Sequence, residues 1–204
     1  MNVTTSGSKV SGITYSTAKW HGRVTINLET NSSPPPSTVA TDKVITFLEN
    51  EDSGLINPHH DTLVISLLIA NYRIKRVLVD NGSSTNVLFL NALKVMKIEQ
   101  SNIHHRSTIL VGFSRKHKFT LGDITLPVYT GGVNLYITFV VLDSPTSYNV
   151  ILGRSWIHET KAIPSTFHQV IRFPTEWGVK EIKGEQGVSC NCYHKTLRAK
   201  PFTL

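Results

Sequence analysis

The residues best suited to chemistry in this chain of 204 residues are the five from Asp80 to Ser84, which read Asp-Asn-Gly-Ser-Ser. Apolar runs precede and follow them. A carboxylate on a tight turn at the end of a buried strand is the arrangement that an aspartic peptidase needs. Gly82 lets the chain approach its surroundings closely. The two serine hydroxyls are expected to hold the Asp80 carboxylate in one rotamer.

Composition indicates a soluble globular protein, with 40% hydrophobic residues and a mean hydropathy of −0.07. No apolar run approaches the roughly 20 residues that span a bilayer, so no membrane association is expected. The first ten residues lack the apolar core of a secretory signal, and Cys190 and Cys192 are too close in sequence for a structural disulfide. We therefore expect a cytoplasmic location, with the nucleus as an alternative, and not secretion.

The net charge of +7 is unevenly distributed along the chain. Residues 1–60 hold four Lys/Arg and five Asp/Glu, whereas residues 61–204 hold 17 and nine. A basic domain can lie near nucleic acid without reading its sequence. A solvated basic surface is the favoured interpretation.

The chain divides by pattern into three segments. Residues 1–57 are rich in Ser and Thr and contain a run of prolines, which predicts a disordered, low-complexity linker. Within it, residues 44–48 have the pattern of a short strand. Residues 58–185 are predicted to form the folded domain, and residues 186–204 a C-terminal tail.

Short strands separated by turns, with few helices, favour a small closed β-barrel. A hairpin of residues 62–69 and 72–79, turning at Ala70-Asn71, is expected to deliver Asp80 to its loop. A second long hairpin is expected to pair residues 107–111 with 119–128. Other expected elements are a helical turn within 87–98, a strand at 135–142, a short helix after Gly153, closing strands at 162–163, 169–173 and 178–182, and packing positions for Trp156 and Trp177.

The order of these elements resembles the retropepsin family, the single-lobed aspartic peptidases of retroviruses and LTR retrotransposons. Within it, the chain is most similar to the protease segment of plant gypsy-class Gag-Pol polyproteins. Three phrases carry the resemblance, which covers about residues 58–195: residues 77–84 (VLVDNGSS), 148–154 (YNVILGR) and 173–179 (FPTEWGV). Asp-x-Gly-Ser followed about 70 residues later by an apolar Ile-Leu-Gly is more specific than Asp-x-Gly alone.

The resemblance implies a closed acid-protease barrel with a flap hairpin and one short C-terminal helix. It also implies a homodimer, because each protomer brings one aspartate, and Asp80 lies in the sole Asp-x-Gly-Ser/Thr of the chain. The implied substrate is a polypeptide, namely the retroelement polyprotein itself. No cofactor and no metal are implied, and nucleic acid is a neighbour only through the polyprotein.

By the same resemblance, Asp80 is the catalytic residue and Asn81, Gly82, Ser83 and Ser84 complete its loop. Gly112, Phe113 and Ser114 are assigned to the flap over the substrate. Ile151, Leu152, Gly153 and Arg154 are assigned to support beneath the loop, with Arg154 expected to pair with a carboxylate or with the dimer partner. The family most often has Thr or Ser where this chain has Asn81.

Two other interpretations remain open. The chain could be a catalytically degenerate copy that serves only as a structural or interaction module. Asn81 favours this interpretation, because the family most often has a hydroxyl side chain at that position. It could instead be a basic module associated with nucleic acid, although no zinc knuckle or RRM-like aromatic motif is present. Cys190, Cys192 and His194 make only a weak zinc pattern, because one residue separates the cysteines and a fourth ligand is missing.

Overall fold

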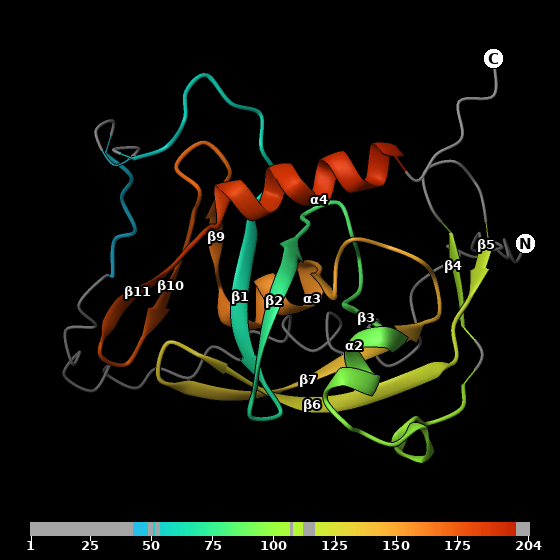
Figure 1. The fold of residues 1–204 in the computed structure, drawn as a ribbon. Coiled ribbons are helices and arrows are strands. Elements are labelled where there is room, and N and C mark those ends of the chain that lie inside the picture. The colour runs from blue at the N-terminus through green and yellow to red at the C-terminus, as the bar shows by residue number, and fades with distance from the viewer. Residues whose placement is uncertain (1–42, 49–50, 52–53, 107, 112–116, 199–204) are drawn as a thin grey trace, which may run out of the picture. The chain divides into compact units, whose positions relative to one another are not determined.

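The computed structural model describes residues 43–48, 51, 54–106, 108–111 and 117–198, with only the backbone described for the last three (Figure 1). All of these residues belong to the second of two units into which the chain divides, residues 42–204. Among them, no helix has both the length and the apolar character needed to cross a bilayer.

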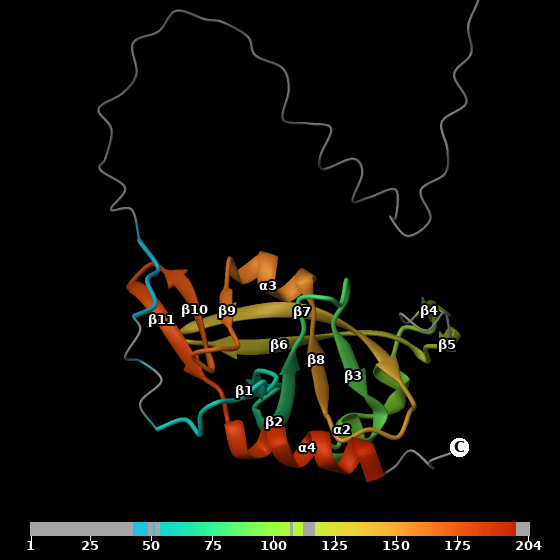
Figure 2. The same ribbon diagram turned by 90° about the horizontal axis from the view of Figure 1, so that it is seen from above.

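Six strands form a closed barrel in the order β1-β2-β8-β3-β7-β6, which confirms the predicted β-barrel class. Figure 2 shows β2, β8 and β3 side by side in this barrel. Two of the neighbouring pairs, β2–β8 and β3–β7, are parallel, and the others are antiparallel. The strands are β1 (Val64–Ile69), β2 (Tyr72–Val79), β3 (Val87–Phe89), β6 (Gly122–Thr130), β7 (Val133–Leu142) and β8 (Val150–Leu152).

Alternation along the strands fills the barrel. In β6, Ile124, Leu126 and Val128 are buried, while the residues between them are at least partly exposed, as a period of two requires. They join Trp156 and Phe139, whose side chains are fully buried, in one main core. Burial of each large apolar side chain stabilises the fold by about 1.5–3 kcal/mol.

The predicted hairpin before Asp80 is confirmed. β1 and β2 pair antiparallel, and the turn between them has positive φ at both Ala70 (48°) and Asn71 (65°). Positive φ at both central residues is typical of a type I′ turn, whose twist matches that of the flanking strands. The hairpin fixes the direction in which β2 leaves the turn and approaches the Asp80 loop.

The second predicted hairpin is only partly correct. A short hairpin does join β4 (Ile109–Val111) to β5 (His117–Phe119). Most of the returning segment, however, belongs to β6, which pairs with β7 along its whole length, from Gly122 opposite Val141 to Thr130 opposite Val133. The apolar face of β6 closes the barrel, and this burial outweighs pairing with the exposed β4.

A smaller sheet of order β11-β10-β9 follows the barrel in sequence. It consists of β9 (Ile163–Ser165), β10 (Val170–Thr175) and β11 (Gly178–Lys183), close to the predicted closing strands. Residues 43–48 form no strand, contrary to prediction. They are attached to β10 by hydrogen bonds from Lys43 to the Thr175 carbonyl and from Arg172 to the Thr46 carbonyl.

Helices occupy four places in the described residues: α2 (Leu90–Val95), the 3₁₀ turn η1 (Gln100–Asn102), α3 (Arg154–Thr160) and α4 (Gln186–Arg198). The expected helical turn within 87–98 and the short helix after Gly153 correspond to α2 and α3. The one short C-terminal helix that was predicted is therefore α3, and α4 is a second helix that the prediction did not include. This helix lies across β1 and β2 (Figure 1), in the segment that was predicted to be a tail.

A polar cluster attaches the start of α4 to the chain just before β1. The Asp61 carboxylate accepts hydrogen bonds from the Cys190 thiol (3.1 Å) and from the Gln186 side-chain amide (3.0 Å). Burial alone would raise the pKa of Asp61, but these two hydrogen bonds and the nearby His59 and His60 outweigh it and lower the pKa. The same thiol hydrogen bond to Asp61 raises the pKa of Cys190.

This cluster makes a prediction about stability against pH. Because the folded-state pKa of Asp61 is depressed, its contribution is present above the unfolded pKa of about 3.9 and is lost as pH falls through the folded value. Asp61→Asn should lower the free energy of unfolding by roughly 1–3 kcal/mol near pH 7, with the gap to wild type closing below about pH 4. Urea unfolding from pH 3 to 7 measures it.

Asp143→Asn is the matched control, because Asp143 is exposed beyond the end of β7. It should leave stability unchanged near pH 7. If the difference in free energy of unfolding between the wild type and Asp61→Asn stays constant from pH 3 to 7, Asp61 does not stabilise the fold through its charge.

Candidate functional site

The loop 80–84 begins where β2 ends, beside the parallel strand β8. Val79 pairs with Leu152 in this ladder, and the next backbone amide, that of Asp80, donates to the Leu152 carbonyl at 2.9 Å. Parallel pairing carries the ends of β2 and β8 to the same edge of the barrel. The Asp-x-Gly-Ser motif and the Ile-Leu-Gly motif, about 70 residues apart in sequence, therefore lie next to each other in space.

The Asp80 carboxylate is held by backbone, and not by the serine hydroxyls that the sequence suggested. The Gly82 amide donates to Asp80 Oδ1 at 2.8 Å, and the Ser83 amide donates to the Asp80 carbonyl at 3.2 Å. The Ser83 hydroxyl instead donates to the Thr85 carbonyl (2.7 Å), and Ser84 is exposed. An amide donor fixes one carboxylate oxygen and leaves the half-buried group facing the loop surface.

Gly153 and Arg154 lie directly under this loop. The Arg154 amide donates to the Ser83 carbonyl at 2.9 Å, and its guanidinium Nη1 donates to the carbonyls of Asn81 (3.1 Å) and Gly82 (3.2 Å). The expected carboxylate partner of Arg154 is thus replaced by loop carbonyls within the described chain. Five donors on a planar guanidinium suit this bracing of two neighbouring carbonyls.

Gly153 is required by space. A Cβ on this residue would lie 2.3 Å from the Thr85 carbonyl oxygen and 2.8 Å from that of Ser83. Its backbone is extended, with φ of −92°, a conformation that any residue can adopt. Glycine is needed at this position because the two carbonyl oxygens leave no room for a side chain. Leu152 is fully buried and Ile151 pairs with Leu78 in β2, which places all four predicted support residues beneath or beside the loop.

Asn86 is a site residue that sequence reasoning missed. It is buried, its side-chain oxygen accepts from the Gly153 amide (3.0 Å), and its side-chain amide donates to the Thr138 carbonyl (3.2 Å). One asparagine thus links the loop, the β8–α3 junction and β7. An amide directly before the apolar run of β3 was the available signal, since a buried polar side chain must find partners.

Beside the carboxylate lies a small hollow of about 280 Å³. Its wall includes Thr62 and Leu63, which lie just before β1, and Pro164 and Thr166 from β9 and the turn after it. Asp80 is the only carboxylate among its lining residues. A larger cavity of about 530 Å³ lies elsewhere, and its lining does not include Asp80.

The predicted flap residues Gly112, Phe113 and Ser114 lie outside the described residues. The strands β4 and β5 on either side of them are described, and both are largely exposed. His117 and Lys118 begin β5. The flanking hairpin is therefore present, whereas the part assigned to contact substrate is not tested.

A single copy of the chain offers one oriented carboxylate at this loop. It can accept or donate a proton, but alone it cannot provide the paired acid and base that two adjacent carboxyl groups provide. Among the described residues, no group of three or more His, Cys, Asp or Glu is placed to hold a metal ion. The Cys190 thiol donates to Asp61, and the Cys192 thiol donates to the Ser147 carbonyl.

The contact beneath the loop makes a prediction. Gly153→Ala forces a methyl group against two backbone carbonyls, so we expect a loss of about 1–3 kcal/mol in the free energy of unfolding and a fall of several degrees in Tm. Thermal and urea unfolding followed by circular dichroism measure it. Gly187→Ala is the control, because nothing lies within 4 Å of the added Cβ and alanine favours helix α4. If both substitutions lower the free energy of unfolding equally, the steric role of Gly153 is wrong.

Comparison with known proteins places the fold. No family model and no curated protein matches the sequence. Among the solved structures that match, two have TM-scores below 0.5. The EIAV protease in complex with the inhibitor HBY-793 is 21% identical, covering 54% of this chain and 98% of that chain, with a TM-score of 0.42. A retropepsin-like aspartic protease from Rickettsia conorii is 18% identical, covering 58% and 80%, with a TM-score of 0.41.

A third solved structure is more similar in shape. The chain resembles the retroviral protease-like domain of Ddi1 from Leishmania major, with 14% identity, a TM-score of 0.50, and 62% of this chain and 96% of that chain covered. At this identity the likeness shows the fold alone, and that fold is a retroviral protease-like β-barrel.

Proposed function

We propose that this protein is an aspartic endopeptidase of the retropepsin type, whose active site forms from Asp80 and the Asp80 of a second copy. One observation carries the proposal. In a retroviral protease-like barrel, the Asp80 loop follows β2, is oriented by the Gly82 amide, and is braced from below by Gly153 and Arg154.

The chemistry follows from two carboxyl groups within hydrogen-bonding distance. They cannot both ionise without strong repulsion, so the pair holds one proton and titrates as a unit. The ionised member takes a proton from a bound water, and the water oxygen attacks the scissile carbonyl carbon. The protonated member donates to the carbonyl oxygen, and collapse of the intermediate breaks the C–N bond as the nitrogen gains a proton.

The proportions of the single protomer support a dimeric site. The hollow beside Asp80, about 280 Å³, is at the small end for a ligand pocket and cannot enclose an extended peptide. Asn81, Gly82 and Ser84 are all exposed at the loop surface. A two-fold axis beside this surface would bring two copies of the loop together, and the cleft between them would accept an extended polypeptide.

The natural substrate that we propose is a retroelement polyprotein containing this domain, as the resemblance to plant gypsy-class Gag-Pol segments implies. The hairpin β4–β5 and the residues between its strands would cover the bound segment. The proposed location is the cytoplasm, with the nucleus as an alternative. Membrane association forms no part of the proposal, and nucleic acid would be a neighbour only through the polyprotein.

A second candidate is a folded and dimeric copy without turnover. It is favoured by Asn81, an exposed amide at the position where the family most often has a hydroxyl. Asparagine carries both a donor and an acceptor, so it can take part in a contact across the dimer axis, but with a longer side chain. The two candidates share the fold and differ only in catalysis.

Asp80→Asn tests catalysis directly. We expect hydrolysis of a polyprotein-derived peptide library, assayed by mass spectrometry between about pH 4 and 7, to fall by roughly 100- to 10,000-fold. The conservative change should leave the unfolding transition and the circular dichroism spectrum unchanged. Asp143→Asn is the control, and its activity should equal that of the wild type.

Cleavage that persists in Asp80→Asn rejects the proposed site. A wild-type protein that folds and dimerises but cleaves nothing supports the second candidate, and recovery of cleavage by Asn81→Thr would locate the defect. Sedimentation equilibrium provides the independent measurement. A strictly monomeric protein at high concentration excludes the mechanism, because one Asp80 cannot form the pair.

A further inference from the structure

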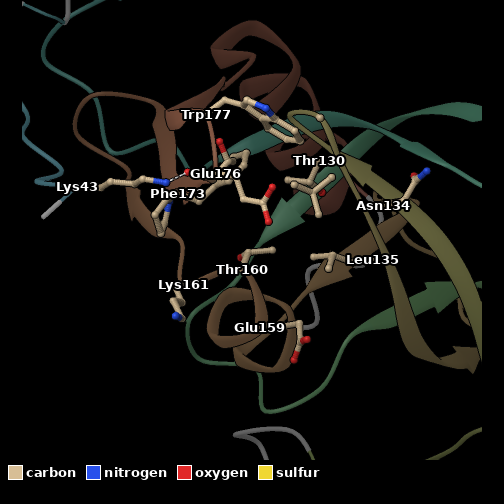
Figure 3. A pocket seen from close by; sticks show the side chains of 14 residues that line it. Lys43, Thr130, Asn134, Leu135, Glu159, Thr160, Lys161, Phe173, Glu176 and Trp177 are labelled. Atoms are coloured by element: carbon tan, nitrogen blue, oxygen red, sulfur yellow. Dashed lines mark hydrogen bonds between the residues drawn. The ribbon is translucent and has the colours of Figure 1, made fainter. Parts of the chain in front are cut away.

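The larger of the two cavities described above, about 530 Å³, lies at the turn of the β10–β11 hairpin (Figure 3). Asp80 is not among its lining residues. Its volume is within the usual range for ligand sites. The β6–β7 turn, the end of α3 and the β10–β11 turn each contribute to its wall. Four features of this cavity together indicate the chemistry of a ligand.

The first feature is an exposed aromatic ring. Trp177 is 66% exposed, so of the two expected positions, core or edge, it occupies an edge. The ring lies against the backbone of the β6–β7 turn, where a Cβ added to Gly132 would be 3.5 Å from it. Phe173 packs even closer to Gly131, where an added Cβ would lie 2.8 Å from its ring. Two glycines thus allow two aromatic residues to form one wall.

The second feature is an unpartnered hydroxyl. Thr130 is 1% exposed and lines the cavity, and its Oγ1 has no hydrogen-bond partner within the described chain. A buried polar atom without a partner costs about 1–3 kcal/mol. The neighbouring Thr160 donates its hydroxyl hydrogen to the Trp156 carbonyl at 2.8 Å, which leaves its oxygen able to accept. A ligand with hydrogen-bond donors would satisfy Thr130.

The third feature is a carboxylate directed inward. Figure 3 shows the Glu176 carboxylate turned toward Thr130 and Thr160, while Glu159 and Lys161 lie at the rim. The remaining lysine, Lys43, donates its ammonium group to the Thr175 carbonyl. Although the lining carries two lysines and two glutamates, the charge that faces the centre is therefore negative.

The fourth feature is the contrast with the rest of the chain. Residues 61–204 hold 17 Lys and Arg but only nine Asp and Glu, and two of those nine line this one cavity. Against this excess of positive residues, the inward-facing Glu176 carboxylate is a local negative group that would attract a cation. An aromatic face beside a carboxylate is the environment that an Arg side chain prefers, since it can stack and donate at once.

We propose that this cavity, formed around Trp177, Glu176 and Thr130, binds an arginine side chain presented by a partner polypeptide. The guanidinium stacks on the Trp177 ring, donates to the Glu176 carboxylate, and supplies the missing donor to Thr130. The site needs neither Asp80 nor catalysis. It gives the protein a docking point for a basic segment that is separate from the proposed cleavage site.

Calorimetric titration of the full chain with a blocked heptapeptide, one central arginine among glycines and serines, tests the proposal. The matched peptide carries citrulline, which has the same shape without the charge. We expect saturable binding of the arginine peptide and at least about tenfold weaker binding of the citrulline peptide, the size of one lost charge-assisted hydrogen bond. In a Trp20→Phe background, which leaves Trp156 and Trp177, tryptophan fluorescence should change on binding. Trp177→Phe should remove that change, because Trp156 is buried.

Glu176→Gln should weaken arginine-peptide binding about tenfold. Glu99→Gln is the control and should not change binding, because Glu99 is an exposed residue directly before η1 and does not line the cavity. Asp80→Asn should bind as the wild type does, so loss of catalysis and loss of this site are distinguishable. Equal binding of both peptides, or no effect of Glu176→Gln, overturns the proposal.

A competing occupant is the chain's own N-terminal segment, whose basic residues within 1–41 are Lys9, Lys19 and Arg23. Changing these three residues to glutamine should leave binding of the arginine peptide unchanged. Binding that appears only after this change overturns the partner proposal, because it would assign the cavity to that segment.

Discussion

The parallel pairing of β2 with β8 is the constraint on which the rest of this structure depends. It joins residues about 70 positions apart and places the Asp80 amide against the Leu152 carbonyl. Long-range pairing of this kind costs loop-closure entropy, which is offset by burial of apolar side chains of both strands in the main core: Val77, Val79, Val150 and Leu152. Once it forms, the Asp80 loop lies directly over the β8–α3 junction.

Close packing converts that pairing into a defined loop. Gly153 lets the Ser83 and Thr85 carbonyls approach, and Arg154 then reaches two more carbonyls of the same loop. Asn86 closes the arrangement from the side of β7. The carboxylate is thus oriented by backbone groups whose positions are set by the barrel, so its direction does not depend on a flexible side-chain partner.

The elements after the barrel connect the two sites. Residues 159–161 line the larger cavity, while Pro164 and Thr166, a few positions further on, line the hollow beside Asp80. On the other side, Asp61 holds α4 and is followed by Thr62 and Leu63, which line the same hollow. The attachment of α4 is therefore continuous with a wall of the proposed catalytic site.

The sequence by itself determined the barrel class and the hairpin that leads to Asp80, because apolar periodicity and turn residues act locally. The meeting of Asp-x-Gly-Ser with Ile-Leu-Gly was expected only from the resemblance to the retropepsin family, because local patterns do not specify contacts between residues about 70 positions apart. Tertiary structure decided what those patterns leave open. The serines do not hold Asp80, Arg154 finds carbonyls, β6 pairs with β7, and the predicted tail contains α4, since each outcome depends on which partner another segment brings near. Trp177 is the clearest case. An aromatic residue of this size is usually largely buried, but its place on the β10–β11 turn, against Gly132, leaves the ring exposed. Local chemistry specifies elements, whereas the partners of polar and aromatic side chains are set by contacts between residues distant in the chain.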